Sequence, residues 1–202
     1  QYSPEEAGRR RLRNTCLGLL STLATEETTA LCLDQFQVAD NMTDQLSALV
    51  CLASLPGPAA DEALTAFYGR WRDVPLVVDK WLSVQASADR DDTAERVDEL
   101  LAHEAFDLRN PNKVRSLVRV FARNQAAFHR LDGVGYAWLG DRILELDPLN
   151  PQIAARTAES FSDWRRYGSR RQHLMRAQLE RIAAAGGLSR DLYEIVLKSL
   201  GD

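Results

Sequence analysis

The sequence predicts an all-α fold, and three observations lead to this prediction. Apolar residues recur at three- and four-residue intervals through much of the chain, which is the spacing of one helix face. Residues that cap helices precede many of these runs, and Pro or Gly follows them. The only β-branched cluster, residues 74–78, contains Pro75 and is too short to indicate a strand. We therefore expect about a dozen amphipathic helices.

The helical pattern is clearest in three segments of the first half of the chain. Between residues 10 and 23 the apolar positions share one face, which we expect to be buried, and they are Leu12, Cys16, Leu19, Leu20 and Leu23. The same spacing occurs at Leu46, Leu49, Val50 and Ala53, and again at Leu64, Phe67, Tyr68 and Trp71. Because each helix is apolar on one side only, each needs helical neighbours.

Local signals mark where these helices begin and end. A side-chain oxygen just before a helix satisfies backbone amides of the first turn, and candidate caps are Ser3, Asn41, Asn110, Asn150 and Ser189. Candidate ends lie at residues 56–58, 132–133, 168 and 186–187, which are rich in Gly and Pro. The caps at Asn110 and Asn150 are 40 residues apart, which matches the repeat of solenoids built from antiparallel helix pairs.

Length and linkers bear on domain organisation. No linker is long enough to require a boundary, so residues 1–202 are expected to form a single domain. The chain begins with Gln1, and Ser3 caps a helix almost immediately. We therefore expect a piece of a longer protein.

Composition narrows the classes of function. Hydrophobic residues make up 45% of the 202 residues, which permits a substantial core. The 25 Lys and Arg residues against 29 Asp and Glu residues give a net charge of -4, which argues against general nucleic-acid binding. No apolar run reaches the roughly 20 residues of a membrane span. Cys16, Cys32 and Cys51 lack paired spacing and are predicted to be buried free thiols, which favours a reducing, cytoplasmic location.

Residues that carry catalysis or bind metals are sparse. None of the three histidines has a second histidine one helical turn away, and His103 begins an H-E-x-x-H-like segment that has Asp107 at its last position. There is no nucleophile elbow and no phosphate-binding glycine loop, and Gly133-Val134-Gly135 is interpreted as a turn between helices. We expect neither a catalytic residue nor a metal ligand in this chain.

Two clusters of arginine, residues 9–13 and 164–171, allow two interpretations. Arginine beside aromatic residues can hold phosphate and stack on bases. Arginine also pairs bidentately with carboxylates, of which this chain has an excess. Salt bridges within or between domains are the favoured interpretation, and nucleic-acid binding is the alternative.

Several segments occur together in an order that is typical of one family. They read RLRN at 11–14, NMTD at 41–44, LVVDKW at 76–81, FDLRNPNKVRSL at 106–117, FHRLDGVGYAWL at 128–139, NPQIAAR at 150–156, WRRY at 164–167 and LSRDLYE at 188–194. With these segments, which extend over almost the whole chain, the sequence resembles the C-terminal domain of bacterial aminopeptidase N, a zinc metallopeptidase of the gluzincin type.

This resemblance implies a fold, partners and a cofactor. It implies a superhelical solenoid of antiparallel helix pairs, HEAT/armadillo-like, that closes as a lid over a catalytic domain and limits access to short peptides. Members of the family bind zinc through H-E-x-x-H and a distant Glu, and they hold the substrate's amino group with G-A-M-E-N. Neither element is present here, so zinc is expected in the full-length enzyme and not in this chain. The expected partners are the N-terminal catalytic domains of the same polypeptide and short peptide substrates.

The resemblance also singles out Arg115 and Arg156. Each follows an Asn-Pro helix start by a few residues, where the family places arginines that face the inner chamber. A guanidinium there would bind the C-terminal carboxylate or the carbonyls of a peptide. The alternative role is an ion pair between helix pairs. Ser160 and Asp163 stand where family members have Pro, so the helix geometry after Arg156 stays open.

A second interpretation of the whole chain is a free-standing helical-repeat scaffold that binds partner proteins. Fold alone does not separate it from the lid of an aminopeptidase.

Overall fold

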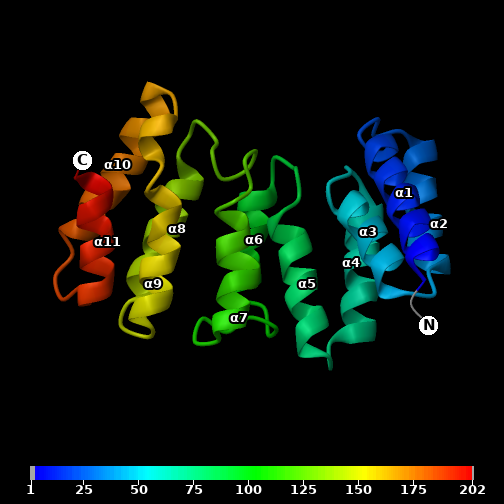
Figure 1. Ribbon diagram of the computed structural model, residues 1–202, viewed down its shortest axis with the longest axis horizontal. Helices are drawn as coiled ribbons and strands as arrows, with labels where there is room; N and C mark the ends of the chain where they lie inside the picture. The colour runs from blue at the N-terminus through cyan, green and yellow to red at the C-terminus, as the bar shows by residue number, and fades with distance from the viewer. Residues whose placement is uncertain (1–2, 202) are drawn as a thin grey trace. The chain divides into compact units, whose positions relative to one another are not determined.

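Helices joined by turns and loops make up residues 3–201, the part that the computed structural model describes (Figure 1). The helices form two compact units, one ending at Arg90 and one beginning at Asp91. The predicted all-α class is confirmed, because eleven α-helices and no strand are found among the described residues.

The first unit contains five helices, each joined to the next by a short turn. They are α1 (Pro4–Ser21), α2 (Glu26–Val38), α3 (Met42–Ala53), α4 (Pro58–Trp71) and α5 (Pro75–Ala86). Helix α3 packs against α1, α2 and α4 and is the centre of the unit. The segment around Pro75 is the first turn of α5 and not a strand, which agrees with the prediction that residues 74–78 do not form a strand.

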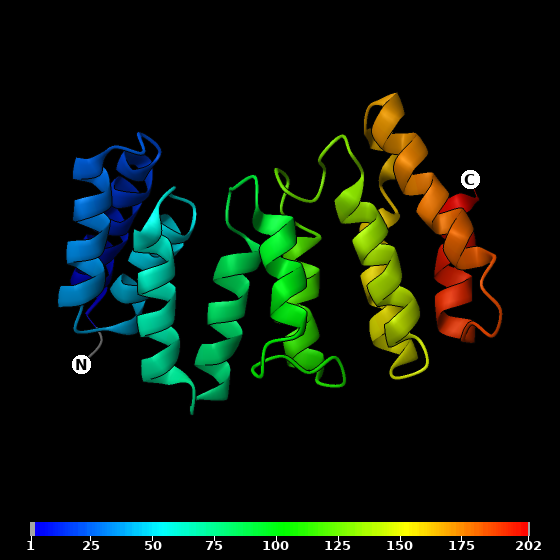
Figure 2. The same cartoon turned by 180° about the vertical axis from the view of Figure 1, so that it is seen from behind.

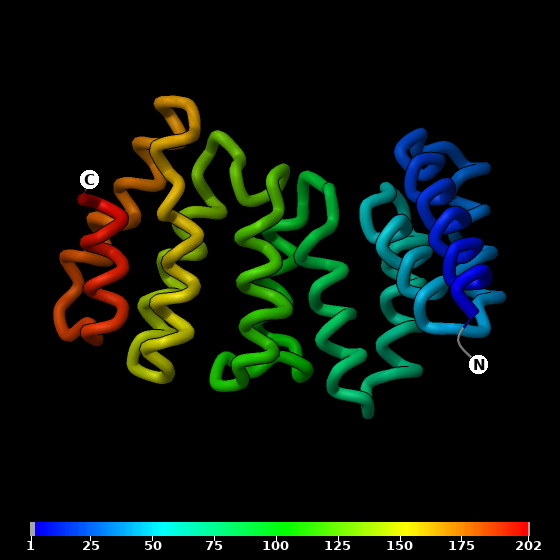
Figure 3. The backbone as a smooth tube through the Cα atoms, in the orientation of Figure 1, coloured from blue at the N-terminus to red at the C-terminus, as the bar shows by residue number. Residues whose placement is uncertain are grey.

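The second unit contains shorter helices and three irregular turns. Its α-helices are α6 (Thr93–Leu101), α7 (Pro111–Val114), α8 (Val134–Leu146), α9 (Pro151–Ala158), α10 (Ser169–Ala183) and α11 (Arg190–Leu200). A π-helical turn, η1 (Arg115–Arg119), continues α7, and two 3₁₀ turns, η2 (Glu159–Phe161) and η3 (Trp164–Arg166), follow α9. The backbone reverses after α8 and enters α9, so the two form an antiparallel pair (Figure 3). Helix α10, orange in Figure 2, packs against α8 and α11.

The predicted helix caps are present. Asn41 accepts a hydrogen bond from the backbone N–H of Asp44 at 3.0 Å, and Asn150 accepts one from Ile153 at 3.2 Å. Ser3, Asn110 and Ser189 cap α1, α7 and α11 in the same way. The cap of α11 is also tied to α8, because the buried Asp147 accepts from Ser189 N–H at 2.8 Å. Caps therefore hold neighbouring helices as well as starting them.

The predicted buried face of α1 is wrong. Leu12, Leu19 and Leu23 are more than 60% exposed, and Cys16, which was expected to be buried, is exposed too. Leu17 is the buried apolar residue of α1. Among the other predicted positions, Leu49, Ala53, Leu64 and Phe67 are buried, whereas Val50 is 45% exposed.

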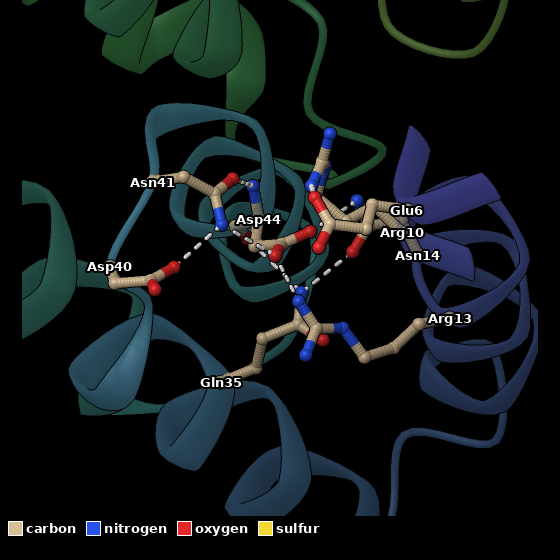
Figure 4. Close-up of polar contacts among 8 residues, drawn as sticks. All are labelled: Glu6, Arg10, Arg13, Asn14, Gln35, Asp40, Asn41 and Asp44. Atoms are coloured by element: carbon tan, nitrogen blue, oxygen red, sulfur yellow. Dashed lines mark hydrogen bonds and ion pairs between the residues drawn. The ribbon is translucent and has the colours of Figure 1, made fainter. Parts of the chain in front are cut away.

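A polar network explains how α1 is rotated (Figure 4). The carboxylate of Asp44, on α3, is 1% exposed and accepts hydrogen bonds from Arg13, from Asn14 at 3.0 Å and from Asn41 at 2.8 Å. Gln35, on α2, donates to the side chain of Asn14 at 2.8 Å. A buried carboxylate needs such donors, so the polar side of α1 turns inward and its leucines turn outward.

The core of the second unit is an aromatic cluster next to a glycine turn. Phe121, Phe128 and Tyr136 are fully buried and meet edge to face, with ring centroids 5.8 and 5.1 Å apart. Gly133 has φ +79°, the left-handed conformation that favours glycine. A Cβ on Gly135 would lie 2.6 Å from the carbonyl oxygen of Phe128. Of the segment predicted to be a turn, only Gly133 lies before the helix, whereas Val134 and Gly135 are the first residues of α8. The lack of a side chain at Gly135 lets the start of α8 approach Phe128.

Removing the carboxylate of Asp44 should destabilise the first unit. Asp44→Ala leaves the amides of Asn14 and Asn41 without their buried acceptor, and we expect a loss of about 2 kcal/mol in the free energy of unfolding. Hydrogen exchange of α1 to α3 under increasing urea measures it. Asp40→Ala, which removes an exposed carboxylate next to the same cap, is the control and should cost less than ~0.5 kcal/mol. Equal effects of the two variants would contradict the role given to Asp44.

Candidate functional site

The first predicted site residue, Arg115, lies at an irregular helical turn. Arg115 is exposed and is the first residue of the π-helical turn η1, which ends at Arg119. Such turns are rare and occur often at functional sites. In a helical segment, residues four apart lie on the same side. Arg115 and Arg119 therefore lie on one side of this segment, and Arg123 lies in the turn that follows it.

The opposite side of the segment is fixed in the core. Val114, Leu117, Val118 and Phe121 are fully buried. The hydroxyl of Ser116 donates to the carbonyl of Asn112 at 2.7 Å, which holds the start of the turn. Because a well-packed apolar face resists rotation, the arginines on the other side have a defined direction.

The second predicted residue, Arg156, is an exposed residue of α9. The geometry after it is now defined: α9 ends at Ala158, and the 3₁₀ turns η2 and η3 follow. Phe161 in η2 is fully buried, and the indole of Trp164 in η3 donates to the carbonyl of Ser199 at 2.9 Å. These contacts fix the end of α9 against α11.

Arg119 connects the two predicted residues. Burial lowers the pKa of the half-buried Arg119 below its ordinary value, and the positive charge of Arg123 lowers it further. Glu159 opposes this effect, whereas Arg115 and Arg156 add to it. All three other guanidinium groups are thus close enough to Arg119 to raise the free energy of its charged form. The charges of Arg115 and Arg156 thus both act on Arg119, and we call the four residues Arg115, Arg119, Arg123 and Arg156 the arginine cluster.

The arginine cluster differs from most other arginines of the second unit. Arg96, Arg130, Arg142, Arg176, Arg181 and Arg190 each pair with a carboxylate, at nitrogen–oxygen distances of 2.6 to 2.8 Å. Among residues 3–201, no carboxylate forms an ion pair with a member of the cluster, and Glu159 acts on it only over a longer distance. Four cations with one nearby anion leave an excess of positive charge at the surface. The cluster can therefore bind an anion.

Sequence reasoning missed Arg119 and Arg123. Their spacing of four from Arg115 is visible in RSLVRVFAR, residues 115–123. What the sequence does not show is that the charge of Arg156, on α9, acts on Arg119.

The two sequence clusters of arginine mostly make internal contacts. In residues 164–171, Arg165 donates to the carbonyls of Ser199, Leu200 and Gly201 at the end of α11. Arg171 donates to the carbonyl of His129 at 2.6 Å. In residues 9–13, Arg10 pairs with Glu6 at 3.9 Å, and Arg13 pairs with Asp44. These contacts agree with the favoured interpretation of the clusters.

A buried histidine joins three parts of the second unit. His129 is 5% exposed; its Nδ1 lies 2.8 Å from the hydroxyl of Tyr136 on α8, and its Nε2 lies 3.0 Å from that of Tyr167. Burial, with a smaller effect of the nearby Arg171 charge, lowers the pKa of His129 to about 4. Burial also raises the pKa of Tyr136 to about 12. The neutral ring is thus a structural link between the two tyrosines.

Residues that could hold a metal do not meet in this structure. Within the described range 3–201, no three His, Cys, Asp or Glu side chains are grouped as a metal ion would require. In the same range, no helix has both the length and the apolar character needed to cross a membrane.

Comparison with known proteins shows the class to which this chain belongs. It is a member of the family described as a domain of unknown function (DUF3458_C) with ARM repeats, whose model matches residues 1–201. The predicted helical-repeat fold of armadillo-like type is therefore confirmed.

Relatives of known name connect this family to one group of enzymes. The chain is 45% identical over 196 residues to aminopeptidase N of Caulobacter vibrioides and 40% identical over 197 residues to that of Escherichia coli. These matches cover 96% and 97% of the chain but only 23% of each relative. The predicted resemblance to the C-terminal region of bacterial aminopeptidase N is confirmed.

A solved structure has the same fold. Aminopeptidase A of Legionella pneumophila, in complex with aspartic acid, matches with a TM-score of 0.93 and 37% identity. The match covers 98% of this chain and 24% of that one. This chain thus spans about a quarter of the aminopeptidases that it matches.

Protonation of His129 should make stability depend on pH. The unfolded histidine binds a proton near pH 6.5, whereas the folded one does so only near pH 4. The free energy of unfolding therefore falls as pH is lowered from about 6.5 to about 4, by on the order of 2 kcal/mol. Urea unfolding at pH 7 and pH 4.5 measures this. His129→Gln should reduce the decline, whereas His173→Gln, at an exposed position, should keep it. A decline that is identical in both variants would refute the assignment.

Proposed function

We propose that this chain is the C-terminal domain of a zinc aminopeptidase that removes N-terminal residues from short peptides. This proposal rests on the match of nearly the whole chain to about a quarter of the length of each bacterial aminopeptidase. According to this proposal, the remaining three quarters of the polypeptide contain the catalytic domain. The present chain then covers the catalytic chamber as a lid. Covering a reaction centre excludes bulk water and restricts the size of the substrate.

The role proposed for the arginine cluster is orientation of the peptide. A peptide that is cleaved at its N-terminus has a free carboxylate at its far end. Arg115 and Arg156 are exposed and have no ion-pair partner among residues 3–201, so both are available to such a carboxylate. A guanidinium group binds a carboxylate through two parallel hydrogen bonds, which fixes direction as well as position. These residues would position the substrate and take no part in bond cleavage.

Zinc and the catalytic residues belong, in this proposal, to the other domains of the polypeptide. We also propose a cytoplasmic location, because all three cysteines are thiols.

Replacing Arg156 should weaken the binding of peptides and leave substrates that lack a C-terminal carboxylate unaffected. In the full-length enzyme, Arg156→Ala should raise KM for tri- and tetrapeptides about tenfold, the loss of one charge-assisted contact. Hydrolysis of a single-residue chromogenic amide should not change, because that substrate does not reach the cluster. Arg190→Ala, which removes an exposed arginine outside the cluster, is the matched control. Unchanged KM for the peptides would eliminate the orienting role.

Metal removal should distinguish this domain from the rest of the enzyme. A chelator should abolish aminopeptidase activity of the full-length protein, and one equivalent of zinc should restore it. The 202-residue chain should neither retain stoichiometric zinc nor hydrolyse aminoacyl amides, and its thermal unfolding should be the same with and without chelator. A tightly bound zinc ion in the purified chain would contradict the division of roles.

A further inference from the structure

The arginine cluster holds more positive charge than one carboxylate requires. A single guanidinium group can bind a carboxylate bidentately. Arg115 and Arg156 would therefore be sufficient for the C-terminus of a peptide. Arg119 lies on the same side of the segment as Arg115, Arg123 lies in the turn that follows, and no ion pair within residues 3–201 neutralises either of them. Two cations thus remain for a second anionic group.

Keeping these groups together is unfavourable without a ligand. The charges of Arg115, Arg123 and Arg156 all disfavour the protonated form of Arg119, and Arg119 is also partly removed from water. Like charges at this proximity repel, and only one carboxylate, Glu159, offsets them. The packed apolar side of the segment prevents the arginines from rotating apart. A ligand with several negative charges would relieve the repulsion, and one with a single charge would do so only in part.

We propose that Arg119 and Arg123, beside Arg115 and Arg156, form a second anion subsite that binds an acidic side chain of a peptide near its C-terminal carboxylate. The ligand class is therefore peptides that carry at least two carboxylates at their C-terminal end. This inference rests on the proposed function, because that function brings peptides to this face.

The surroundings favour a peptide over a nucleic acid. Phe121, the aromatic residue that follows Arg119 by two positions, is fully buried and presents no face on which a base could stack. The chain has a net charge of -4, so its overall field does not attract a long polyanion. The positive excess is local, which suits a short ligand with two or three charges.

Binding to the 202-residue chain tests the inference without any catalysis. The probes are the tetrapeptides Ala-Ala-Asp-Glu and Ala-Ala-Asn-Gln, both with a free C-terminus, so that they differ only in the acidic side chains. Calorimetric titration at low ionic strength, where charge interactions are least screened, gives the Kd of each. We expect the acidic peptide to bind at least tenfold more tightly than the neutral one. The double variant Arg119→Gln, Arg123→Gln should lose most of this difference, whereas the control Arg176→Gln, Arg190→Gln should retain it.

Stability measurements keep the result interpretable. Because Arg119 and Arg123 repel each other, the double variant should have a Tm equal to or higher than that of the unchanged chain. A lower Tm would mean that the arginines have a structural role and would count against the subsite. Equal affinity of the double variant and the unchanged chain for the acidic peptide would overturn the proposal. Tighter binding of duplex DNA or inorganic phosphate than of the acidic peptide, lost in the same variant, would also overturn it.

The two proposals fail in different ways. If the full-length protein does not hydrolyse aminoacyl amides, the proposed function fails, even where the chain binds acidic peptides through Arg119. If the full-length enzyme is active but its KM for Ala-Ala-Asp-Glu is unchanged by the double substitution, the acidic-peptide subsite fails and the proposed function stands.

Discussion

Burial of one side of the segment that contains η1 is the constraint on which the candidate site depends. Val114, Leu117, Val118 and Phe121 are completely enclosed, so this helical segment cannot turn about its axis without exposing apolar surface. A side chain on the opposite surface then has a fixed direction, even when it is long and charged. The positions of the arginines are thus a consequence of hydrophobic packing, and the charges themselves oppose the arrangement.

Local chemistry made much of the fold predictable from the sequence. The caps at Asn41, Asn150 and Ser189 form as expected, because a capping side chain bonds to amides only a few residues away. The orientation of α1 was not predictable in this way. Its leucines follow a convincing helical pattern, yet a carboxylate about 30 residues further along, Asp44, turns the opposite side inward. Periodicity shows that a helix has two sides, and it does not show which side meets a buried charge.

The candidate site was predictable only in part for a related reason. Arg115 and Arg156 came from the resemblance of their segments to a known family, and the charges of both act on Arg119. A π-helical turn has no clear sequence signature, and proximity between η1 and α9 is a tertiary property. The functional interpretation of Arg119 and Arg123 therefore depends on Arg156, which is distant from them in the sequence.

The uneven exposure of the three cysteines gives the chain a natural attachment point for a probe. Cys16 is on the surface of α1, whereas Cys32 and Cys51 are enclosed within the first unit. A maleimide dye would therefore react selectively at Cys16 without replacement of the other two. Its emission would report whether the outward leucines of α1 are wetted or covered, and so whether another part of a longer polypeptide rests on that surface.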